Sequence, residues 1–198
     1  MGSANKIGVL ILGSFLVFAP AILGEISSQR RLLFFFDKIE VNGEVDVFLN
    51  KGKRNREATI YADSEIIDSV RTRVSKRTLY VDANNTYRLA RRLPFLKLNA
   101  QRKFPVEIMI SIDKLTEIRV LGGSNLTSEG LNSDKLSVFC SSTGKIHLEN
   151  LLSPALHLRH EGSGTVVLRG KGVNRLEAQI LGNGLLRAEE FTIGEATL

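Results

Sequence analysis

The chain has 198 residues, 43% of them hydrophobic, with 17 glycines, no tryptophan and a net charge of +6. This length and composition are typical of one folded domain with an additional segment, and they exclude a wholly disordered chain. The single cysteine, Cys140, excludes an internal disulfide and a cysteine-rich metal site, and three histidines without suitable partners predict no zinc and no other cofactor.

Residues 1–24 are expected to lie outside the fold. An apolar run from Ile7 to Phe18 is followed by Ala19-Pro20-Ala21, and this is the pattern of a secretory signal peptide. An uncleaved membrane anchor over residues 7–26 stays open, because about 20 apolar residues are enough to cross a bilayer. In both interpretations the body of the protein is exported, to the periplasm, the cell surface or the medium.

Residues 25–33 are predicted to be a linker, and residues 34–82 an N-terminal cap that mixes strands with one helix. Apolar residues alternate through Ile39-Val41-Gly43-Val45-Val47, which predicts a strand, a glycine corner and a second strand. Further short strands are expected at residues 59–61 and 79–81. A short helix is expected over residues 65–74, with Asp63 or Ser64 as its N-cap.

Residues 83–106 form a basic insert, which is the best candidate site in the sequence. It carries no acid, and aromatic and aliphatic residues separate its cations, which are Arg88, Arg91, Arg92, Lys97, Arg102 and Lys103. This mixture favours docking on anionic lipid or acidic glycan, with charge supplying attraction and apolar side chains inserting at the boundary. The alternative is a solvated cap whose charges prevent edge-to-edge aggregation. Nucleic acid is not an expected partner of an exported protein.

Residues 107–198 repeat every twenty residues. One column is apolar (Ile118, Val138, Leu158, Ala178), one is small (Gly122, Ser142, Gly162, Gly182), and a second bend recurs at Gly130, Asn150 and Gly170. One unit cannot bury its own apolar face, but stacked units can, with equivalent strands paired ~4.8 Å apart. The prediction is an all-β fold, a single-stranded, right-handed parallel β-helix or solenoid with twenty-residue coils. A meander of antiparallel hairpins explains the constant period poorly.

Several segments together carry a resemblance to a known family. They are Phe36 to Leu49, Ala62 to Ile67, Leu79 to Val81, Leu115 to Ser124, and the corner Gly162-Ser163-Gly164. In order and spacing they resemble the putative auto-transporter adhesin, head GIN domain family over most of residues 34–198. The resemblance implies an exported bacterial β-helical domain of unknown function, without catalytic residues. The chain departs from the family pattern at residues 140–144 and 181–184, where Gly-Ser-Gly would be commoner.

Cys140 and His160 share one column on consecutive coils, which brings them about one strand spacing apart. A thiolate beside an imidazolium is a nucleophile arrangement. Their column neighbours are Val120 and Ile180, however, so the column is expected to face the core, where a cysteine behaves as a small hydrophobe. The core interpretation is favoured, with the histidine satisfied by a nearby hydroxyl.

Three functions follow from these features. The first is a non-enzymatic, adhesin-like binding or structural module of the cell envelope. It would use a flat outward ladder of polar residues, namely Glu117, Arg119, Ser137, His157, Arg159, Glu177 and Gln179. The second is a peripheral protein that docks on anionic membrane through the basic insert. The third, a polysaccharide hydrolase, needs paired carboxylates, and Glu149 and Glu189 are two coils apart. Candidate partners are envelope glycans, proteins, anionic membrane, or a second copy through the solenoid ends.

Overall fold

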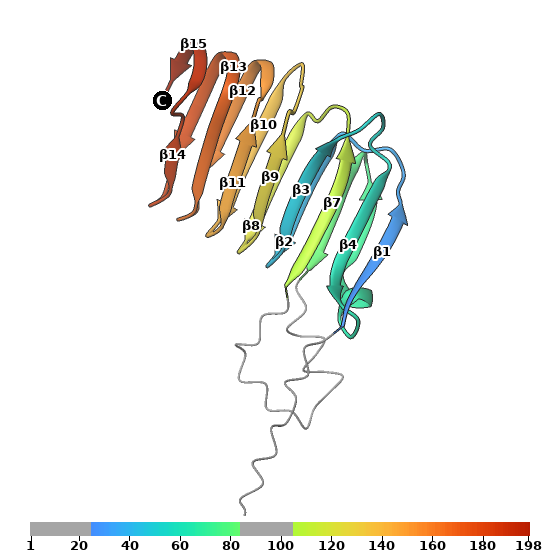
Figure 1. Ribbon diagram of the computed structural model, residues 1–198. Helices are drawn as coiled ribbons and strands as arrows, with labels where there is room; N and C mark the ends of the chain where they lie inside the picture. The colour runs from blue at the N-terminus through green and yellow to red at the C-terminus, as the bar shows by residue number, and fades with distance from the viewer. Residues whose placement is uncertain (1–24, 84–104) are drawn as a thin grey trace, which may run out of the picture.

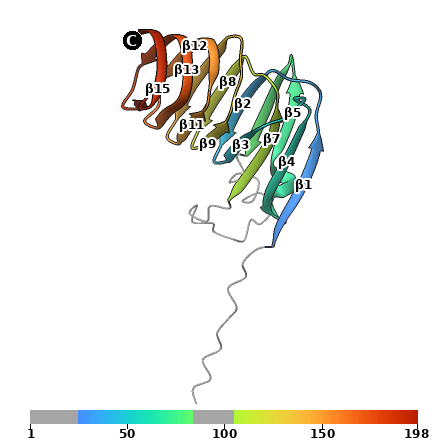
Figure 2. The same cartoon turned by 45° about the horizontal axis from the view of Figure 1, so that its top comes forward.

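The computed structural model describes residues 25–83 and 105–198, so the N-terminal apolar segment and the six cations of the basic insert lie outside the described residues. The described chain is all-β, with fifteen strands in one open, hydrogen-bonded network and a single 3-10 turn, η1 (Ile67–Ser69). Figures 1 and 2 show the strands stacked from β5 and β1 at one end to β15 at the other. No helix in the described part is both long and apolar enough to cross a membrane.

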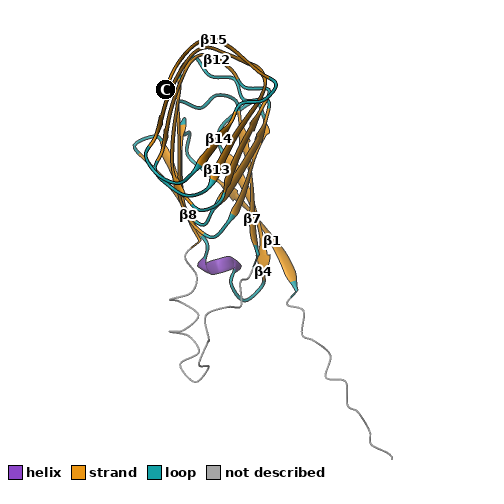
Figure 3. Ribbon diagram, turned by 90° about the vertical axis from the view of Figure 1, so that its left-hand side faces the viewer, coloured by secondary structure: helices purple, strands orange, loops and turns teal. Residues whose placement is uncertain are grey.

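The strands form two layers that face each other (Figure 3). The first layer, in spatial order, contains β1 (Ile26–Leu32), β4 (Glu57–Asp63), β7 (Val106–Ile112), β3 (Asp46–Lys51), β9 (Asn125–Glu129), β11 (Lys145–Glu149), the first part of β13 (Thr165–Ile180), and β14 (Leu185–Arg187). The second contains β5 (Arg71–Ser75), β6 (Thr78–Ala83), β2 (Lys38–Gly43), β8 (Glu117–Gly122), β10 (Leu136–Ser142), β12 (Leu152–His160), the second part of β13, and β15 (Phe191–Thr197). The apolar side chains of both layers meet between them and form one core.

The twenty-residue spacing of the sequence is the register of the parallel pairing. Val138 pairs with Ile118 on one side and with Leu158 on the other, and Leu158 pairs in turn with Ala178. All four side chains are buried, because alternation turns every second residue of each strand inward. Each equivalent position therefore repeats the same environment one strand spacing further along the stack.

The second bend of the repeat uses left-handed backbone conformations. Gly130 (φ 85°), Asn150 (φ 49°), Gly170 (φ 106°) and Glu190 (φ 57°) stand twenty residues apart, and all four have positive φ. Glycine and asparagine tolerate this region, whereas a glutamate is strained there. The bend expected from the first three residues is confirmed. Its fourth occurrence carries a residue poorly suited to it.

The first strand pair does not lie at the end of the stack. β2 lies between β6 and β8, and β3 lies between β7 and β9, all in parallel register. Along the chain, β2 and β3 are followed by β4, β5 and β6, which lie nearer the end of the stack. The chain then returns as β7 beside β3 and as β8 beside β2. Gly43 at the end of β2 is level with Ala83 at the end of β6. The chain thus leaves β6 at Ala83, beside the corner where the neighbouring unit turns through Gly43.

Two expectations for the N-terminal part are wrong. Residues 25–33 are not a linker, because β1 pairs antiparallel with β4 and hydrogen-bonds its open edge. The helix over residues 65–74 does not form. One 3-10 turn, with the Asp63 carboxylate accepting from the Glu65 backbone at 2.8 Å, is followed by β5, which pairs with β6. Pairing satisfies the backbone of this β-branched segment, and the expected mixed α/β cap is strand-rich.

Arg31 joins the two layers at this end of the stack. It lies on β1, in the first layer, and its guanidinium donates to Val70 O at 2.7 Å and to Thr72 Oγ1 at 3.0 Å beside β5, in the second layer. Gln29 Oε1 accepts further bonds from it. Burial lowers the pKa of Arg31, while the carboxylate of Asp68 acts in the opposite direction. This side chain closes one end of the core with hydrogen bonds instead of apolar packing.

Candidate functional site

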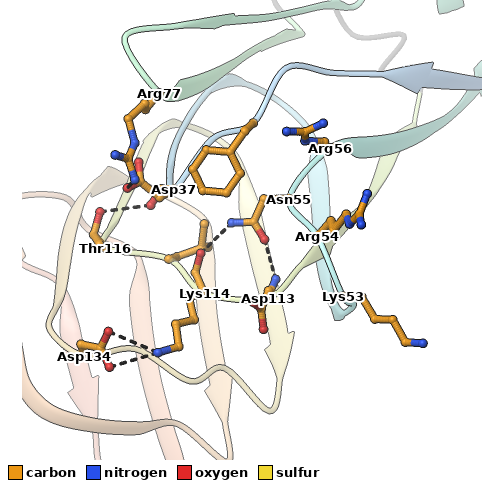
Figure 4. Close-up of a pocket in the computed structure, with 12 residues that line it drawn as sticks. Asp37, Lys53, Arg54, Asn55, Arg56, Arg77, Asp113, Lys114, Thr116 and Asp134 are labelled. Carbon is orange, nitrogen blue, oxygen red and sulfur yellow. Dashed lines mark hydrogen bonds and ion pairs between the residues drawn. The ribbon is translucent and has the colours of Figure 1, made fainter.

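A concave surface opens at the ends of β3 and β7 (Figure 4). We call it the basic cleft; its volume is about 460 Å³. Its walls are the β3–β4 loop, the β7–β8 loop, the segment before β2 and the turn before β6. The charged side chains that line it are Lys53, Arg54, Arg56, Arg77 and Lys114, together with Asp37, Asp113 and Asp134.

Asn55 holds the cationic β3–β4 loop in place. Its side chain is only 1% exposed, although residues on both sides of it are exposed. The amide nitrogen donates to Phe36 O at 2.8 Å and to Lys114 O at 2.6 Å, and the amide oxygen accepts from the Asp113 backbone. One buried amide therefore fixes the loop against both neighbouring segments of the cleft (Figure 4).

The charges of the cleft are only partly paired. Arg77 pairs with Asp37, and Lys114 pairs with Asp134 at 3.2 Å. Within the described ranges, no carboxylate lies at ion-pair distance from Lys53, Arg54 or Arg56, which are all exposed. The β3–β4 loop thus presents three cations whose charge is available to an anionic ligand.

Aromatic and aliphatic surface adjoins these cations. Phe35 lines the cleft, is 44% exposed, and lies 5.3 Å from the guanidinium carbon of Arg77, measured to the ring centroid. Leu32 at the end of β1 and Phe34 in the connection from β1 to β2 are more than four-fifths exposed. Leu33 joins this connection to the loop by donating its backbone N–H to Arg56 O at 2.8 Å. The cleft therefore offers apolar contact area as well as charge.

The outward ladder predicted from the sequence is present, with none of its seven residues buried. Its charges, however, largely satisfy one another. Glu117 pairs with Lys38 at 3.1 Å, Arg119 pairs with Glu40 at 3.3 Å, and His157 Nδ1 lies 2.6 Å from Glu177. Surface pairs of this kind leave little net charge for a ligand. The basic cleft, with its unpaired cations, is the stronger candidate.

Cys140 and His160 belong to the core, as their column predicted. Both are fully buried, and His160 Nδ1 lies 3.2 Å from Cys140 O while Nε2 lies 2.9 Å from Gly164 O. The expectation of a hydroxyl partner for the histidine is wrong, because backbone carbonyls take that place. Burial raises the pKa of the Cys140 thiol, with the Ser142 backbone opposing it. A thiolate nucleophile is therefore disfavoured at this position.

The structure leaves the predicted insert site untested, since Arg88, Arg91, Arg92, Lys97, Arg102 and Lys103 all lie outside the described residues. In the described ranges, no three His, Cys, Asp or Glu side chains are grouped so that they could hold a metal ion. Sequence reasoning missed the basic cleft. Its available signal was four cations within Lys51 to Arg56, close in space to an exposed Phe35.

An open stack of in-register β repeats, with polar outward ladders and a basic cleft, defines the class as an all-β repeat protein. The sequence matches the family profile "Putative auto-transporter adhesin, head GIN domain" over residues 35–198, so the chain belongs to this family. The resemblance seen in the sequence is thereby confirmed. No curated protein sequence matches the chain.

Solved structures share the fold at low sequence identity. A protein described as a putative adhesin from Parabacteroides distasonis ATCC 8503 aligns with a TM-score of 0.60 and 15% identity, covering 87% of this chain and 77% of its own. A putative lipid binding protein from the same organism aligns at 0.61 and 15%, covering 88% and 78%. A putative adhesin from Parabacteroides merdae ATCC 43184 aligns at 0.56 and 19%, covering 88% and 77%. At these identities the likeness concerns the fold alone.

Proposed function

We propose that the protein is a non-enzymatic, exported, adhesin-like binding module of the cell envelope. In this proposal the repeats form a right-handed β-solenoid, and the domain holds an anionic component of the envelope at its basic cleft. The family and its structural relatives, which are named as adhesins, support the general class. The apolar pattern of residues 7–26 supports export, by a cleaved signal or by an uncleaved anchor.

The observation that carries the proposal is the set of unpaired cations on an anchored loop. A loop built only for solubility does not need a buried amide with three hydrogen bonds, yet Asn55 fixes Arg54 and Arg56 in this way. Fixing a loop before binding lowers the entropy lost on association. The outward ladder, by contrast, is neutralised by its own ion pairs.

Export and binding are tested separately. Cells that produce the full chain with a C-terminal epitope tag are fractionated, and intact cells are treated with protease. We expect the tag in the envelope or the medium, and a tag confined to the cytoplasm would contradict the proposal. The purified chain is then applied to a glycan array and incubated with the glycans that it binds. Binding without release of new reducing ends is expected, whereas their release would favour the hydrolase.

A second candidate, docking on anionic membrane through the basic insert, is favoured by one observation. Ile26, which follows the N-terminal apolar segment, pairs with Asp63, and the adjacent Ala62 pairs with Val106, where the chain returns from the insert. Two strand spacings, about 10 Å, separate these attachment points. An uncleaved anchor would therefore keep the cations of the insert close to the bilayer surface.

Liposome sedimentation of residues 25–198 tests this second candidate. If the insert docks, the protein binds anionic but not neutral vesicles, and salt weakens the binding because the charges are screened. The quadruple change of Arg91, Arg92, Arg102 and Lys103 to Ser then abolishes it. Sedimentation that is equal with anionic and neutral vesicles, or that survives this change, would return the insert to the role of a solvated cap.

A further inference from the structure

We propose that the basic cleft binds an acidic sugar, a unit of an anionic polysaccharide that carries a carboxylate or phosphate group. This inference rests on the proposed binding function and names its ligand class and its residues. The anionic group lies against Lys53, Arg54 and Arg56, and a sugar hydroxyl lies against the carboxylate of Asp113. The cleft volume of about 460 Å³ is within the usual range for small-ligand sites and accommodates one or two sugar rings.

The cations determine the charge of the ligand. Lys53, Arg54 and Arg56 follow one another in the β3–β4 loop, interrupted only by the inward Asn55. All three are positively charged, and none has an ion-pair partner among the described residues. A guanidinium presents a planar fork of donors that matches the two oxygens of a carboxylate or a phosphate. Because Arg54 and Arg56 flank an anchored residue, their backbones are fixed before the ligand arrives. This arrangement selects an anion over a neutral sugar.

Asp113 argues for a sugar instead of a bare anion or a lipid surface. Asp37 and Asp134 are neutralised by Arg77 and Lys114, whereas Asp113 keeps an unpaired negative charge in the same cleft, which disfavours a dense layer of anionic headgroups. Carboxylates do accept hydrogen bonds from hydroxyls, which sugars supply. Asp113 is exposed and has no ion-pair partner in the described chain, so its carboxylate can receive a donor from the ligand.

The exposed ring and the position of the cleft agree with this ligand. Phe35 offers a half-exposed aromatic face, on which the apolar face of a sugar ring can pack. The cleft lies beyond Leu32 and Glu57, at the strand ends opposite Ile26 and Asp63. Seven residues of β1 separate these ends, which is about 20 Å. A polymer can therefore reach the cleft even if the domain is attached to the envelope through the chain that precedes Ile26.

Titration calorimetry of the full chain in a neutral detergent tests the inference, with trigalacturonate as the first probe and its neutral methyl ester as the ligand control. We expect binding of the acid, at least about tenfold weaker binding of the ester, and loss of affinity at higher salt. The double variant R54S/R56S should bind at least about tenfold more weakly. The matched variant R169S/R187S removes two exposed arginines elsewhere and should bind like the wild type.

Two further comparisons identify the anionic group that is bound, and a stability measurement shows whether each variant is folded. Mannose 6-phosphate, compared with mannose, shows whether phosphate replaces carboxylate. The variant R54K/R56K keeps the charge but loses the planar fork, so it should bind more weakly than wild type while retaining the salt dependence. Equal urea midpoints for all variants show that the fold is intact.

The inference is overturned if no acidic sugar in a panel of hexuronate oligomers and sugar phosphates binds. It is also overturned if R54S/R56S binds trigalacturonate as tightly as R169S/R187S, which would place the site elsewhere while the binding function itself stands. Binding to anionic vesicles that depends on Arg54 and Arg56, without binding of any acidic sugar, would assign the cleft to membrane instead. Failure of the proposed function is distinct, since the tagged chain would then be cytoplasmic.

Discussion

Replacement of Asn55 by alanine should destabilise the domain more than any surface polar substitution. The change removes one donor group with two bonds, to Phe36 O and Lys114 O, and one acceptor for the Asp113 backbone N–H. Asn55 is 1% exposed, so water cannot replace these bonds without opening the loop. An intramolecular hydrogen bond contributes about 1 kcal/mol net, and a buried group left without a partner costs about 1–3 kcal/mol. We expect a loss of about 3 kcal/mol in the free energy of unfolding.

The matched control is Asn125→Ala. Asn125 also uses both ends of its amide, donating to Asp46 Oδ1 at 2.7 Å and accepting from the Lys145 backbone at 2.7 Å, but it is exposed. Water can replace its partners, so the expected loss is under about 1 kcal/mol. Urea unfolding followed by circular dichroism gives both values, provided that the slope against denaturant stays constant. Equal losses for the two variants would refute the assignment of Asn55 as the anchor of the loop.

Four further changes test the geometry of the stack. Gly164→Ala should cost about 1–3 kcal/mol in urea unfolding, because its Cβ would lie 2.0 Å from Gly144 O, a backbone atom that cannot move aside. Glu190→Gly should stabilise by about 1 kcal/mol in the same assay, because glycine tolerates φ 57°. Arg31→Ala should lower the free energy of unfolding by about 2 kcal/mol, because the bonds to Val70 O and Thr72 Oγ1 are lost. Arg31→Lys should recover only part of this loss, because lysine lacks the planar fork of donors that joins the two layers. Burial raises the pKa of Cys140 above 9.0, so the thiol ionises at lower pH in the unfolded chain than in the folded one. The free energy of unfolding should therefore fall as the pH rises through that value. Urea unfolding at about pH 7 and about pH 10 should show a smaller stability of wild type relative to Cys140→Val at the higher pH.

The regular part of the fold could be predicted because its constraints repeat. Inward positions such as Val138 are apolar in most units, and bends such as Gly130 adopt positive φ, which favours glycine and asparagine. Equivalent residues therefore recur at one spacing, and that spacing is the register. The family profile covers residues 35–198, so the region that matches the family includes every repeat unit of the stack.

The N-terminal part could not be predicted in this way because tertiary pairing overrides local pattern. Ile66, Ile67 and Val70 have helical spacing, yet they are buried around a short turn and the chain continues as β5. Residues 26–32 carry mostly polar side chains, so their sequence resembles a linker, but an edge strand needs only backbone partners. Neither segment contains a local signal that distinguishes these outcomes.

The basic cleft was missed for a topological reason. Its cations on the β3–β4 loop are adjacent in sequence, but the partners that make a cleft come from the segments around Asp37, Arg77 and Asp113. These segments meet because β2 and β3 are enclosed between strands that follow later in the chain. If the repeat units are assumed to stack in the order of the sequence, β2 and β3 lie at the end of the stack, and the segments that form this cleft are not brought together.

The residues that flank the insert and the basic cleft lie at opposite ends of the same strands, and this separates their roles. The chain enters at Ile26 on β1 and returns from the insert at Val106 on β7, with β4 between these two strands, whereas the β3–β4 loop lies beyond the other end of β4. A flat surface that lies across one end of strands about 20 Å long does not reach their other end. If the insert docks on membrane, the basic cleft therefore faces away from that bilayer, toward the polymers of the envelope. If it does not, the basic cleft remains a described surface with three adjacent unpaired cations, and its affinity for acidic sugars tests the proposed binding function.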